Sequence, residues 1–318
     1  MAALAPRSAL ITGANRGLGL ELVRQMAEGR SAGTRHLLAC CRHPDGPRSE
    51  ALQELAKRHP EVITVLQLDT TDLSSIQQCS QQVGSLLGSG GLNLLINNAG
   101  IISHGTMQTT SPEEMLATFN TNVMGPMNVT KEFLPHLRAA AAASGTAGMS
   151  CSKAAVINIS SVLGSIDITA QSYSAYPALA YRISKVALNM MTACAAQEFK
   201  QSDILFAVLH PGWVKTDMGG EGAEIEASES VGGMLRVMDS LTEKQNGAFL
   251  NYKGEPLSWR TVYCVVLTAV ARPRHQVELF HTATLEGQIL RGLGLLPLML
   301  APGQKKGNIF SVKKSWKV

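Results

Sequence analysis

Residues 8–19 of the chain read Ser8-Ala-Leu-Ile-Thr-Gly-Ala-Asn-Arg-Gly-Leu-Gly19. A short apolar run stops at Thr12, a glycine-rich turn follows, and apolar residues then recur at helical spacing as far as Met26. A strand, a glycine turn and a helix in this order open a β-α-β unit. Glycines let the backbone approach a pyrophosphate, whose charge then lies at the positive end of the helix dipole. The turn therefore predicts a nucleotide site, although the gap between its first two glycines differs from the common G-x-G-x-x-G spacing.

Composition predicts a globular protein with a full hydrophobic core, as one large α/β domain or two small ones. The 318 residues are 45% hydrophobic and 16% charged, and a chain of this length can bury a sizeable core. Its six cysteines are scattered, with no pair or neighbouring histidine at metal-ligand spacing. We therefore expect reduced thiols in a cytoplasmic protein, and neither a disulfide nor a metal site. The first residues lack an apolar leader and no run of about 18 apolar residues occurs, so neither secretion nor a membrane span is expected.

The net charge of +4 belongs to the end of the chain. After Trp259, nine lysines and arginines accompany two glutamates, so the remainder of the chain is acidic. The basic balance therefore gives no indication of a nucleic-acid interface on the main body.

Two arginines predict which dinucleotide the chain prefers. The apolar run 36–41 reads as a second strand and ends at Arg42, where many dinucleotide folds carry an acid that accepts the ribose 2′-hydroxyl. Here the strand ends in a cation, and the glycine turn holds another, Arg16. A cation at this point accommodates a 2′-phosphate, so the pattern favours NADP(H) over NAD(H). Both arginines could also be ordinary surface residues.

Polar residues follow two further predicted strands. Asp69 comes directly after the strand 62–68, where the adenine of a dinucleotide would lie, and Asp72 is the better candidate for the N-cap of the next helix. Asn97-Asn-Ala-Gly100 follows the strand 92–96. Its amides could tie neighbouring strands and its small residues leave room for a ligand, although a plain turn has the same composition.

The middle of the chain predicts a long helix with a polar, kinked centre. Ser111-Pro-Glu-Glu114 has the N-cap, proline and glutamate that begin a helix, and the pattern continues as far as Leu137. Asn122 lies in its interior, where asparagine is disfavoured, and Gly125-Pro126 soon interrupts the pattern. We therefore regard Asn122 as a functional candidate. Residues 139–147 are rich in alanine, glycine and serine and predict a loose surface connection.

The strongest chemical candidate is the pair Tyr181 and Lys185. The predicted strand 155–159 ends at Ser160-Ser161, an aromatic loop follows, and Tyr181 then begins a long helix. Positions four apart share one helical face, so the Lys185 ammonium is expected within reach of the Tyr181 hydroxyl. The ammonium would favour the phenolate and bring its pKa toward neutrality, as a general acid/base pair requires. Alternatively, the two residues fall one turn apart by chance.

The last part of the main body adds two predicted strands, 204–209 and 249–252. His210-Pro-Gly-Trp-Val-Lys-Thr216 follows the first of them, and its backbone could line a planar ring.

The ordered set of motifs resembles the short-chain dehydrogenase/reductase family. The set comprises Thr12-Gly-x-x-x-Gly-x-Gly19, Asp69, Asn97-Asn-Ala-Gly100, Asn122, Ser161, Tyr181-x-x-x-Lys185 and Pro211-Gly212. Within that family, residues 210–220 and 251–259 are similar to the C-signal factor and sniffer type of carbonyl reductase. The resemblance implies one NADP-binding domain over residues 1–259, with a Rossmann-type, doubly wound parallel sheet of about seven strands and helices on both faces.

The resemblance also implies a role for each catalytic candidate. Tyr181 would exchange the proton, and Lys185 would lower the pKa of Tyr181 and hold the nicotinamide ribose. Ser161, which precedes Val162-Leu-Gly164 in the manner of the family, would hydrogen-bond the substrate oxygen, and Asn122 would anchor a water in the proton relay. The residues implied to bind NADP(H) are Gly13, Asn15, Arg16, Gly17, Leu18, Gly19, Arg42, Asp69, Asn97, Ala99, Gly100, Tyr181, Lys185, Pro211, Gly212, Val214 and Thr216. Among these, Val214 and Thr216 would bind the carboxamide.

Two features depart from the family pattern. Ser161 and Tyr181 lie 20 positions apart, which exceeds the commonest family spacing, although longer loops occur in the sniffer-like group. We expect the extra residues to wall the substrate pocket, with apolar lining from Ile166, Tyr173, Tyr176 and Trp213. Residues 260–318 match nothing in the family. This basic extension is expected to be poorly ordered, or alternatively to pack on the body or contact a membrane surface or a partner.

These features predict an NADPH-dependent carbonyl reductase. An apolar pocket with one oxygen-binding set suits aldehydes, ketones and quinones, or the corresponding alcohols, and offers no clamp for a phosphorylated substrate. The alternative is a signalling protein that senses the dinucleotide without turnover. Neither G-x-S-x-G nor G-x-x-x-x-G-K-[ST] occurs to indicate hydrolysis. The family resemblance suggests a homodimer or homotetramer.

Overall fold

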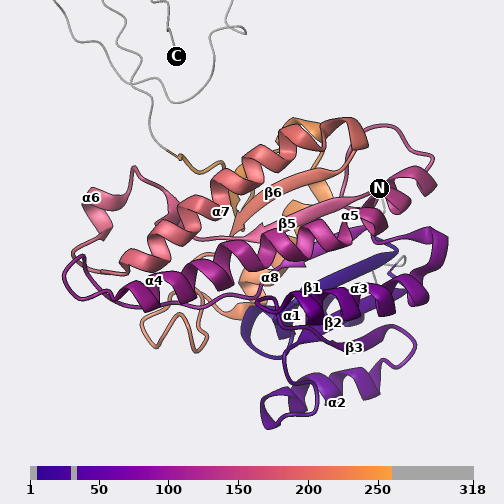
Figure 1. The fold of residues 1–318 in the computed structure, drawn as a ribbon, viewed down its shortest axis with the longest axis horizontal. Coiled ribbons are helices and arrows are strands. Elements are labelled where there is room, and N and C mark those ends of the chain that lie inside the picture. The colour runs from indigo at the N-terminus through magenta and orange to yellow at the C-terminus, as the bar shows by residue number, and fades with distance from the viewer. Residues whose placement is uncertain (1–5, 30–33, 260–318) are drawn as a thin grey trace, which may run out of the picture. The chain divides into compact units, whose positions relative to one another are not determined.

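The computed structural model describes residues 6–29 and 34–259. They form a seven-stranded parallel sheet with helices on both faces (Figure 1), which confirms the expected fold class. The basic segment 260–318 and the cysteine within it, Cys264, lie outside the described residues. Within the described ranges, no helix is both long enough and apolar enough to cross a bilayer.

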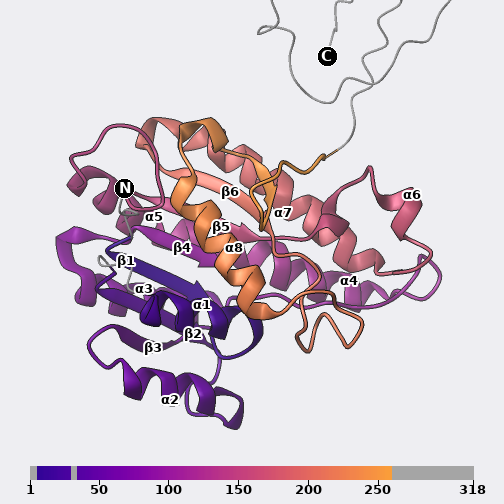
Figure 2. The ribbon, with the colours of Figure 1, turned by 180° about the vertical axis from the view of Figure 1, so that it is seen from behind.

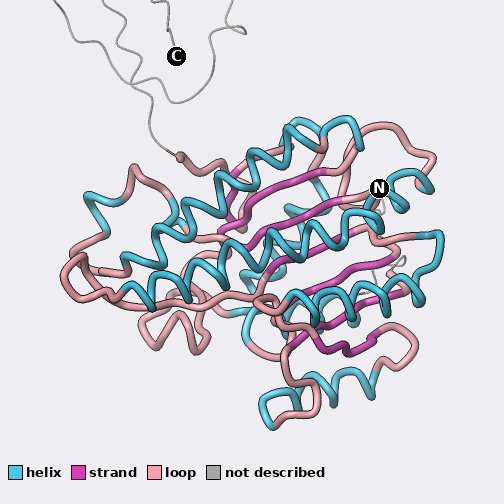
Figure 3. The backbone as a smooth tube through the Cα atoms, in the orientation of Figure 1, coloured by secondary structure: helices cyan, strands magenta, loops and turns pink. Residues whose placement is uncertain are grey.

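The sheet has the strand order β3-β2-β1-β4-β5-β6-β7. The strands are β1 (Ser8–Thr12), β2 (His36–Cys41), β3 (Ile63–Gln67), β4 (Leu94–Asn97), β5 (Ala155–Ile159), β6 (Leu205–His210) and β7 (Phe249–Asn251). The α-helices are α1 (Gly17–Glu28), α2 (Glu50–Arg58), α3 (Leu73–Leu87), α4 (Pro112–Phe119), α5 (Gly125–Ala143), α6 (Thr169–Ser172), α7 (Leu179–Glu198) and α8 (Ala227–Ser240). Short turns are the 3-10 segments η1 (Pro47–Ser49), η2 (Gly88–Gly90), η4 (Val162–Gly164), η5 (Lys200–Ser202) and η6 (Glu243–Gln245), and the π-helical segment η3 (Asn120–Met124). Figure 3 shows the strands side by side between the helices.

The chain changes direction once across the sheet. From β1 it steps outward through β2 to β3, then crosses to the other side of β1 and continues from β4 to β7. The loops that leave the carboxyl ends of β1 and β4 therefore part in opposite directions. A crevice opens at such a switch point, and ligands of open α/β sheets bind there.

Alternating side chains along the strands supply two hydrophobic layers. Leu10 packs in the layer under α3, α5 and α7, whereas its neighbour Ile11 packs in the layer under α1, α2 and α8. Figure 2, which views the molecule from behind, shows this second set of helices on the side facing the viewer. Because helices cover both faces, the strands read in the sequence as nearly continuous apolar runs.

The glycine-rich turn packs directly on the loop that follows β4. The Thr12 hydroxyl oxygen accepts hydrogen bonds from the backbone N–H groups of Asn98 and Ala99, at 3.1 and 3.0 Å. Gly13 has a φ of +66°, and a Cβ there would lie 3.0 Å from the Cα of Ala99. A Cβ on Gly19 would clash with the Gly13 carbonyl oxygen and lie 2.7 Å from the Asn98 side-chain nitrogen. The two loops can meet this closely only because these positions lack side chains.

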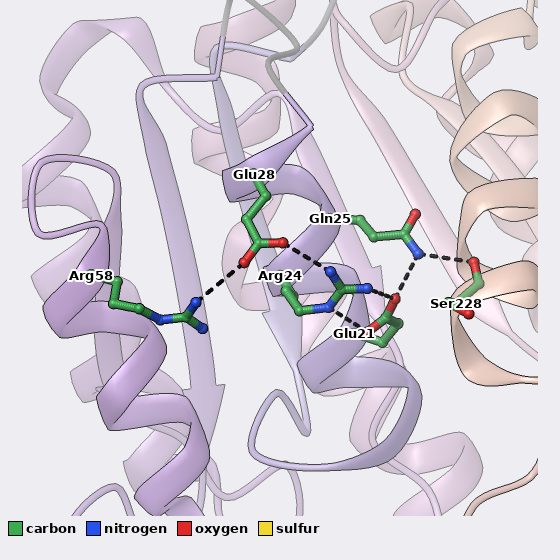
Figure 4. A network of polar contacts seen from close by, with 6 residues as sticks. All are labelled: Glu21, Arg24, Gln25, Glu28, Arg58 and Ser228. Atoms are coloured by element: carbon green, nitrogen blue, oxygen red, sulfur yellow. Dashed lines mark hydrogen bonds and ion pairs between the residues drawn. The ribbon is translucent and has the colours of Figure 1, made fainter.

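Helix α1, which begins at this turn, is tied to both of its neighbours (Figure 4). Arg24 pairs with Glu28 at 2.8 Å, and Glu28 also pairs with Arg58 of α2 at 3.5 Å. Gln25 donates to the Ser228 carbonyl oxygen of α8 at 2.9 Å. Partly exposed pairs of this kind contribute about 1 kcal/mol or less each. We infer that they orient α1 between α2 and α8 more than they stabilise it.

Local signals placed the starts of α3 and α4 correctly. The Asp72 carboxylate accepts from the Ser74 N–H and caps α3. Ser111 and Glu114 form the reciprocal capping box of α4. The expected polar kink around Asn122 is the π-helical segment η3, which joins α4 to α5.

Two local expectations were wrong or incomplete. Helix α5 continues to Ala143, so the first part of the predicted surface connection 139–147 is helical. Alanine has the highest helix propensity, and Ala140 is buried against the sheet, so the helix is stabilised beyond its predicted end. Helix α8 was not predicted, because Gly232 and Gly233 weaken its helical signal; packing of Val231, Met234 and their neighbours on the sheet overrides that propensity.

We predict that Gly19→Ala destabilises the fold by about 1 to 3 kcal/mol, because its methyl group is forced against the Gly13 carbonyl. Gly232→Ala in α8 is the control, since a Cβ there meets no described atom closer than 3.4 Å. Alanine in an unobstructed helix position should be neutral or stabilising by roughly 0.5 to 1 kcal/mol. Urea unfolding of both variants measures the difference, and equal stabilities would contradict the close packing of the turn.

Candidate active site

A cleft of about 310 Å³ opens at the carboxyl ends of the central strands. The expected dinucleotide residues that line it are Gly13, Asn15, Arg16, Gly17, Leu18, Arg42, Asp69, Ala99, Gly100, Tyr181, Lys185, Pro211 and Thr216. The fold thus brings the glycine turn, the loops after β2, β3, β4 and β6, and the head of α7 to one place.

Four expected dinucleotide residues support this cleft from behind its lining: Gly19, Asn97, Gly212 and Val214. The Asn97 amide donates to the Asn158 side-chain oxygen at 2.8 Å and so ties β4 to β5. Gly212 has a φ of +86° and packs on Ile225, to which Val214 is also bridged. Gly19 lies under the turn, as described above. These residues support the cleft through backbone conformation or, for Asn97, a side-chain hydrogen bond, and do not line it.

Tyr181 and Lys185 meet on one face of α7, as their spacing predicts. Their residues are only 7% and 5% exposed. The Lys185 Nζ lies 5.4 Å from the centroid of the Tyr181 ring. It donates to the Ile159 carbonyl oxygen, at the carboxyl end of β5, over 2.9 Å.

The sequence predicts that Lys185 lowers the pKa of Tyr181, but in the polypeptide alone this pKa is raised. Burial raises the pKa of Tyr181 to about 12, and the hydrogen bond with the Ser161 hydroxyl opposes this only in part. Burial also lowers the pKa of Lys185 to about 8. The Lys185 nitrogen lies over the face of the ring and bonds to Ile159. We infer that in this position it does not offset the loss of hydration at the phenol oxygen.

The two serines after β5 have different partners. The Ser160 hydroxyl donates to the Asn189 side-chain oxygen at 2.7 Å, although the residue itself lines the cleft. The Ser161 hydroxyl accepts from the Leu163 N–H at 3.1 Å and hydrogen-bonds Tyr181. The geometry therefore pairs Ser161, and not Ser160, with the phenol.

Asn122 is fully buried in the π-helical segment. Its side-chain oxygen accepts from the Ile101 N–H, and its amide donates to the Ile101 carbonyl oxygen, both over 2.9 Å. The same amide donates to the Ser184 hydroxyl on α7 over 3.0 Å. Since both amide hydrogens are used, this side chain joins the loop after β4 to α7 rather than offering a free donor. A π-helical turn at such a position commonly accompanies a functional site.

A second cavity of about 430 Å³ adjoins the cleft at its outer end. It is lined by Asn15, Arg16, Arg42, His43, Gly46, Pro47, Arg48 and Ser49, and no acidic residue is among them. Arg16 also pairs with Asp217 across the cleft mouth, at 2.5 Å. Sequence reasoning selected Arg16 and Arg42 but missed His43 and Arg48. The cluster of basic residues from 42 to 48 was the available signal.

The residues expected to wall a substrate pocket lie outside this cleft. Tyr176 packs edge-on against His104, and Tyr173 lies under the Arg182 guanidinium. Ile166 and Trp213 are 55% and 46% exposed. Arg182, whose Nη2 donates to the Ser172 hydroxyl and the Tyr176 carbonyl oxygen, packs the part of the long loop that carries Tyr173 and Tyr176 onto α7. Apolar residues that do line the cleft include Leu68, Ile101, Ile159 and Met218, which the sequence did not indicate.

Comparisons with known proteins agree on one family. Residues 7–226 match the family model described as short chain dehydrogenase. The C-signal of Myxococcus xanthus is 36% identical over 171 residues, which cover 54% of this chain and 94% of that protein. An uncharacterized oxidoreductase of Schizosaccharomyces pombe is 33% identical over 263 residues, which cover 77% of this chain and 94% of that protein.

Solved structures give the same result at higher identity. The NADPH-bound carbonyl reductase from chicken fatty liver is 44% identical, with a TM-score of 0.76, over 80% of this chain and 99% of that one. The carbonyl reductase Sniffer of Drosophila melanogaster is 38% identical, with a TM-score of 0.75, over 80% of this chain and all of that one. The fold and the resemblance to the sniffer group, both expected from the motifs, are thus confirmed.

We predict that burial of Lys185 makes the stability of the protein depend on pH. Its pKa is about 8 in the folded chain and 10.5 in the unfolded one. Between these values the unfolded state binds more protons, so the free energy of unfolding rises with pH. Relative to Lys185→Met, the wild-type protein should therefore gain stability between pH 8 and pH 10, by on the order of 2 to 3 kcal/mol. Urea unfolding of both proteins across this range measures the difference; a constant difference would contradict the lowered pKa.

Proposed function

The chain belongs to the short chain dehydrogenase family, and we propose that it is an NADPH-dependent reductase of aldehyde, ketone or quinone carbonyls. The observation that carries this proposal is the meeting of Tyr181, Ser161 and Lys185 beside the cleft that the glycine turn lines. A carbonyl reductase with bound NADPH is among the structural relatives, which supports both the reaction class and the cofactor.

The cleft fits a dinucleotide. Helix α1 begins at Arg16 without a side-chain cap and carries no acid in its first turn. Its free N–H groups and positive dipole end are therefore available to a pyrophosphate. The left-handed backbone of Gly13 and Gly17 leaves room for such a group above the turn. Asp69 also lines the cleft, in the loop after β3, where its carboxylate could hold an adenine.

The cationic outer cavity supports a preference for a 2′-phosphate. Arg16, Arg42 and Arg48 surround a space whose lining has no carboxylate to accept a ribose hydroxyl. Part of the Arg16 charge is compensated by Asp217. Arg42 forms no ion pair with any other described residue. We therefore assign Arg42 the larger share of phosphate recognition.

The catalytic residues are arranged to deliver a proton to a carbonyl oxygen. A bound nicotinamide would supply the hydride. Because burial raises the pKa of Tyr181 to about 12, its phenol stays protonated at neutral pH and can act as the donor. The Ser161 hydroxyl, which already bonds the phenol, would hold the same substrate oxygen. Lys185, fixed to Ile159, would hold the ribose hydroxyls.

The substrate end of the cleft favours small uncharged carbonyl compounds. Ile101, Ile159 and Met218 give it an apolar lining. The charged side chains of the cleft are Lys185, next to the phenol, and a group at the outer end that includes Arg16 and Arg42. A substrate carrying a phosphate would therefore find no dedicated partner beside Tyr181.

We predict that Tyr181→Phe lowers kcat by about 10²- to 10⁴-fold, because it removes the proton donor. NADPH affinity should change by less than about threefold, since only the reacting end is altered. Tyr173→Phe removes a phenol hydroxyl from the neighbouring loop and serves as the control. Turnover is followed by NADPH absorbance over a panel of aldehydes, ketones and quinones. Wild-type protein that binds NADPH but reduces none of them would instead favour the dinucleotide-sensing alternative.

A second prediction concerns the choice of cofactor. Arg42→Ala should weaken NADPH binding by roughly 10- to 100-fold, as expected for the loss of one charge-assisted phosphate contact. NADH binding should be unchanged, because NADH lacks that phosphate. Arg138→Ala, which removes an arginine from α5 outside both cavities, is the control. Dissociation constants measured by fluorescence titration decide the matter, and equal losses for the two cofactors would contradict the assignment.

A further inference from the structure

Asn189 links helix α7 to the turn that carries Ser161. It lies eight positions after Tyr181 and four after Lys185, so all three side chains share one helical face. The residue is 1% exposed. Its side-chain oxygen accepts from the Ser160 hydroxyl at 2.7 Å, and its amide donates to the Gly164 carbonyl oxygen at 3.1 Å.

These two bonds connect Asn189 to the turn on either side of Ser161, at Ser160 and at Gly164. The turn also has internal bonds, from the Gly164 N–H to the Ser161 carbonyl oxygen and from the Leu163 N–H to the Ser161 hydroxyl oxygen. Internal bonds fix the shape of the turn but not its distance from α7. The Asn189 bonds fix that distance, because they join the turn to the helix that carries Tyr181.

Gly164 confirms how closely the turn and the helix pack. A Cβ on Gly164 would lie 2.9 Å from the Asn189 amide nitrogen and 2.9 Å from the Lys185 Cβ. The turn is thus pressed onto α7 at the point where Asn189 holds it. A displacement of this contact would move the Ser161 hydroxyl relative to the phenol.

We propose that Asn189 is a positioning residue, which holds the Ser161 hydroxyl opposite the Tyr181 phenol so that both can bond one substrate oxygen. This inference rests on the proposed reductase function. Misplacement of a reacting group by about 1 Å can cost about 10²-fold in rate. Asn189 does not itself line the cleft, and it reaches the site through Ser160 and Gly164 of the turn.

The expected signature is a loss of kcat that depends on Ser161. Asn189→Leu keeps the number and branching of the side-chain heavy atoms and removes both bonds. It should lower kcat by roughly 10- to 100-fold while NADPH affinity stays within about twofold, because Lys185 and the glycine turn are untouched. Ser161→Ala should lower kcat by about 10²- to 10³-fold. In the Ser161→Ala background, Asn189→Leu should cost less than about threefold more, since the hydroxyl that it positions is already absent.

Thr192→Val is the matched control for simple destabilisation. Thr192 is also fully buried on α7, and its hydroxyl accepts from Asn158 of β5 at 2.8 Å and donates to the Leu188 carbonyl oxygen. Its loss removes buried hydrogen bonds from the same helix without touching the Ser161 turn. Thermal unfolding should shift similarly in both variants, whereas kcat should fall only in Asn189→Leu.

Asn189→Asp adds a test that tolerates poor folding of the leucine variant. A neutral carboxyl can accept from Ser160 and donate to Gly164, but a carboxylate can no longer donate. Burial raises the pKa of a carboxyl group. The kcat of Asn189→Asp should therefore be near wild type at low pH and fall as pH rises through that pKa, at pH values where thermal unfolding shows the variant folded.

Each contrary outcome has a distinct meaning. Undiminished turnover in Ser161→Ala would overturn both the proposed function and this inference. Suppose that Ser161→Ala is impaired, but that Asn189→Leu lowers kcat by the same factor in the Ser161→Ala background as in the wild type. That result would overturn only the positioning role of Asn189. A wild-type pH profile in Asn189→Asp would have the same meaning.

Discussion

The hydrogen bond from Lys185 to the Ile159 carbonyl oxygen holds helix α7 in register with the carboxyl end of β5. A buried ammonium is costly unless its hydrogens find acceptors, and burial lowers the pKa of this one to about 8. The helix can slide along the sheet only by breaking this bond and leaving the charge without its partner. The positions of Tyr181, Ser184 and Asn189, which share the inner face of α7, all follow from that register. The buried Lys185 ammonium, which is costly to desolvate, therefore sets the geometry of the site through its bond to Ile159.

The reversal of the sheet supplies the space in front of this helix. Loops after β1 and β4 diverge at the switch point, yet Thr12 and Gly13 hold them in contact with Asn98 and Ala99. The floor of the cleft is consequently backbone rather than side chain, and polar N–H groups remain exposed to a ligand. Charge is placed at the outer end by Arg16 and Arg42, and apolar surface near Tyr181 by Ile101 and Met218. One cleft thus offers a polar half and an apolar half.

The strands and the site positions could be predicted from the sequence because their signals are local. Helices cover both faces of the sheet, so strands such as β2 and β5 are nearly continuous apolar runs whose bounds match the expected ones. The relation between Tyr181 and Lys185 required only the helical period. Helix α8 was not predicted because its glycines weaken the local helical signal. The packing on the sheet that stabilises it cannot be seen in any local pattern. The places of Tyr173 and Tyr176 depended on Arg182, a contact made across a loop whose path the sequence does not specify.

The sign of the Tyr181 shift was beyond local reasoning for a related reason. The spacing of Tyr181 and Lys185 shows that the two residues are close. It does not show where the Lys185 nitrogen lies relative to the phenol oxygen, or how much water reaches either group. Burial penalises both charged forms at once, raising the pKa of Tyr181 to about 12 and lowering that of Lys185 to about 8. A phenol that stays protonated at neutral pH is suited to give a proton to a carbonyl oxygen, whereas alcohol oxidation begins from the phenolate. Any group that favours the phenolate must therefore stabilise negative charge on Tyr181 against that burial.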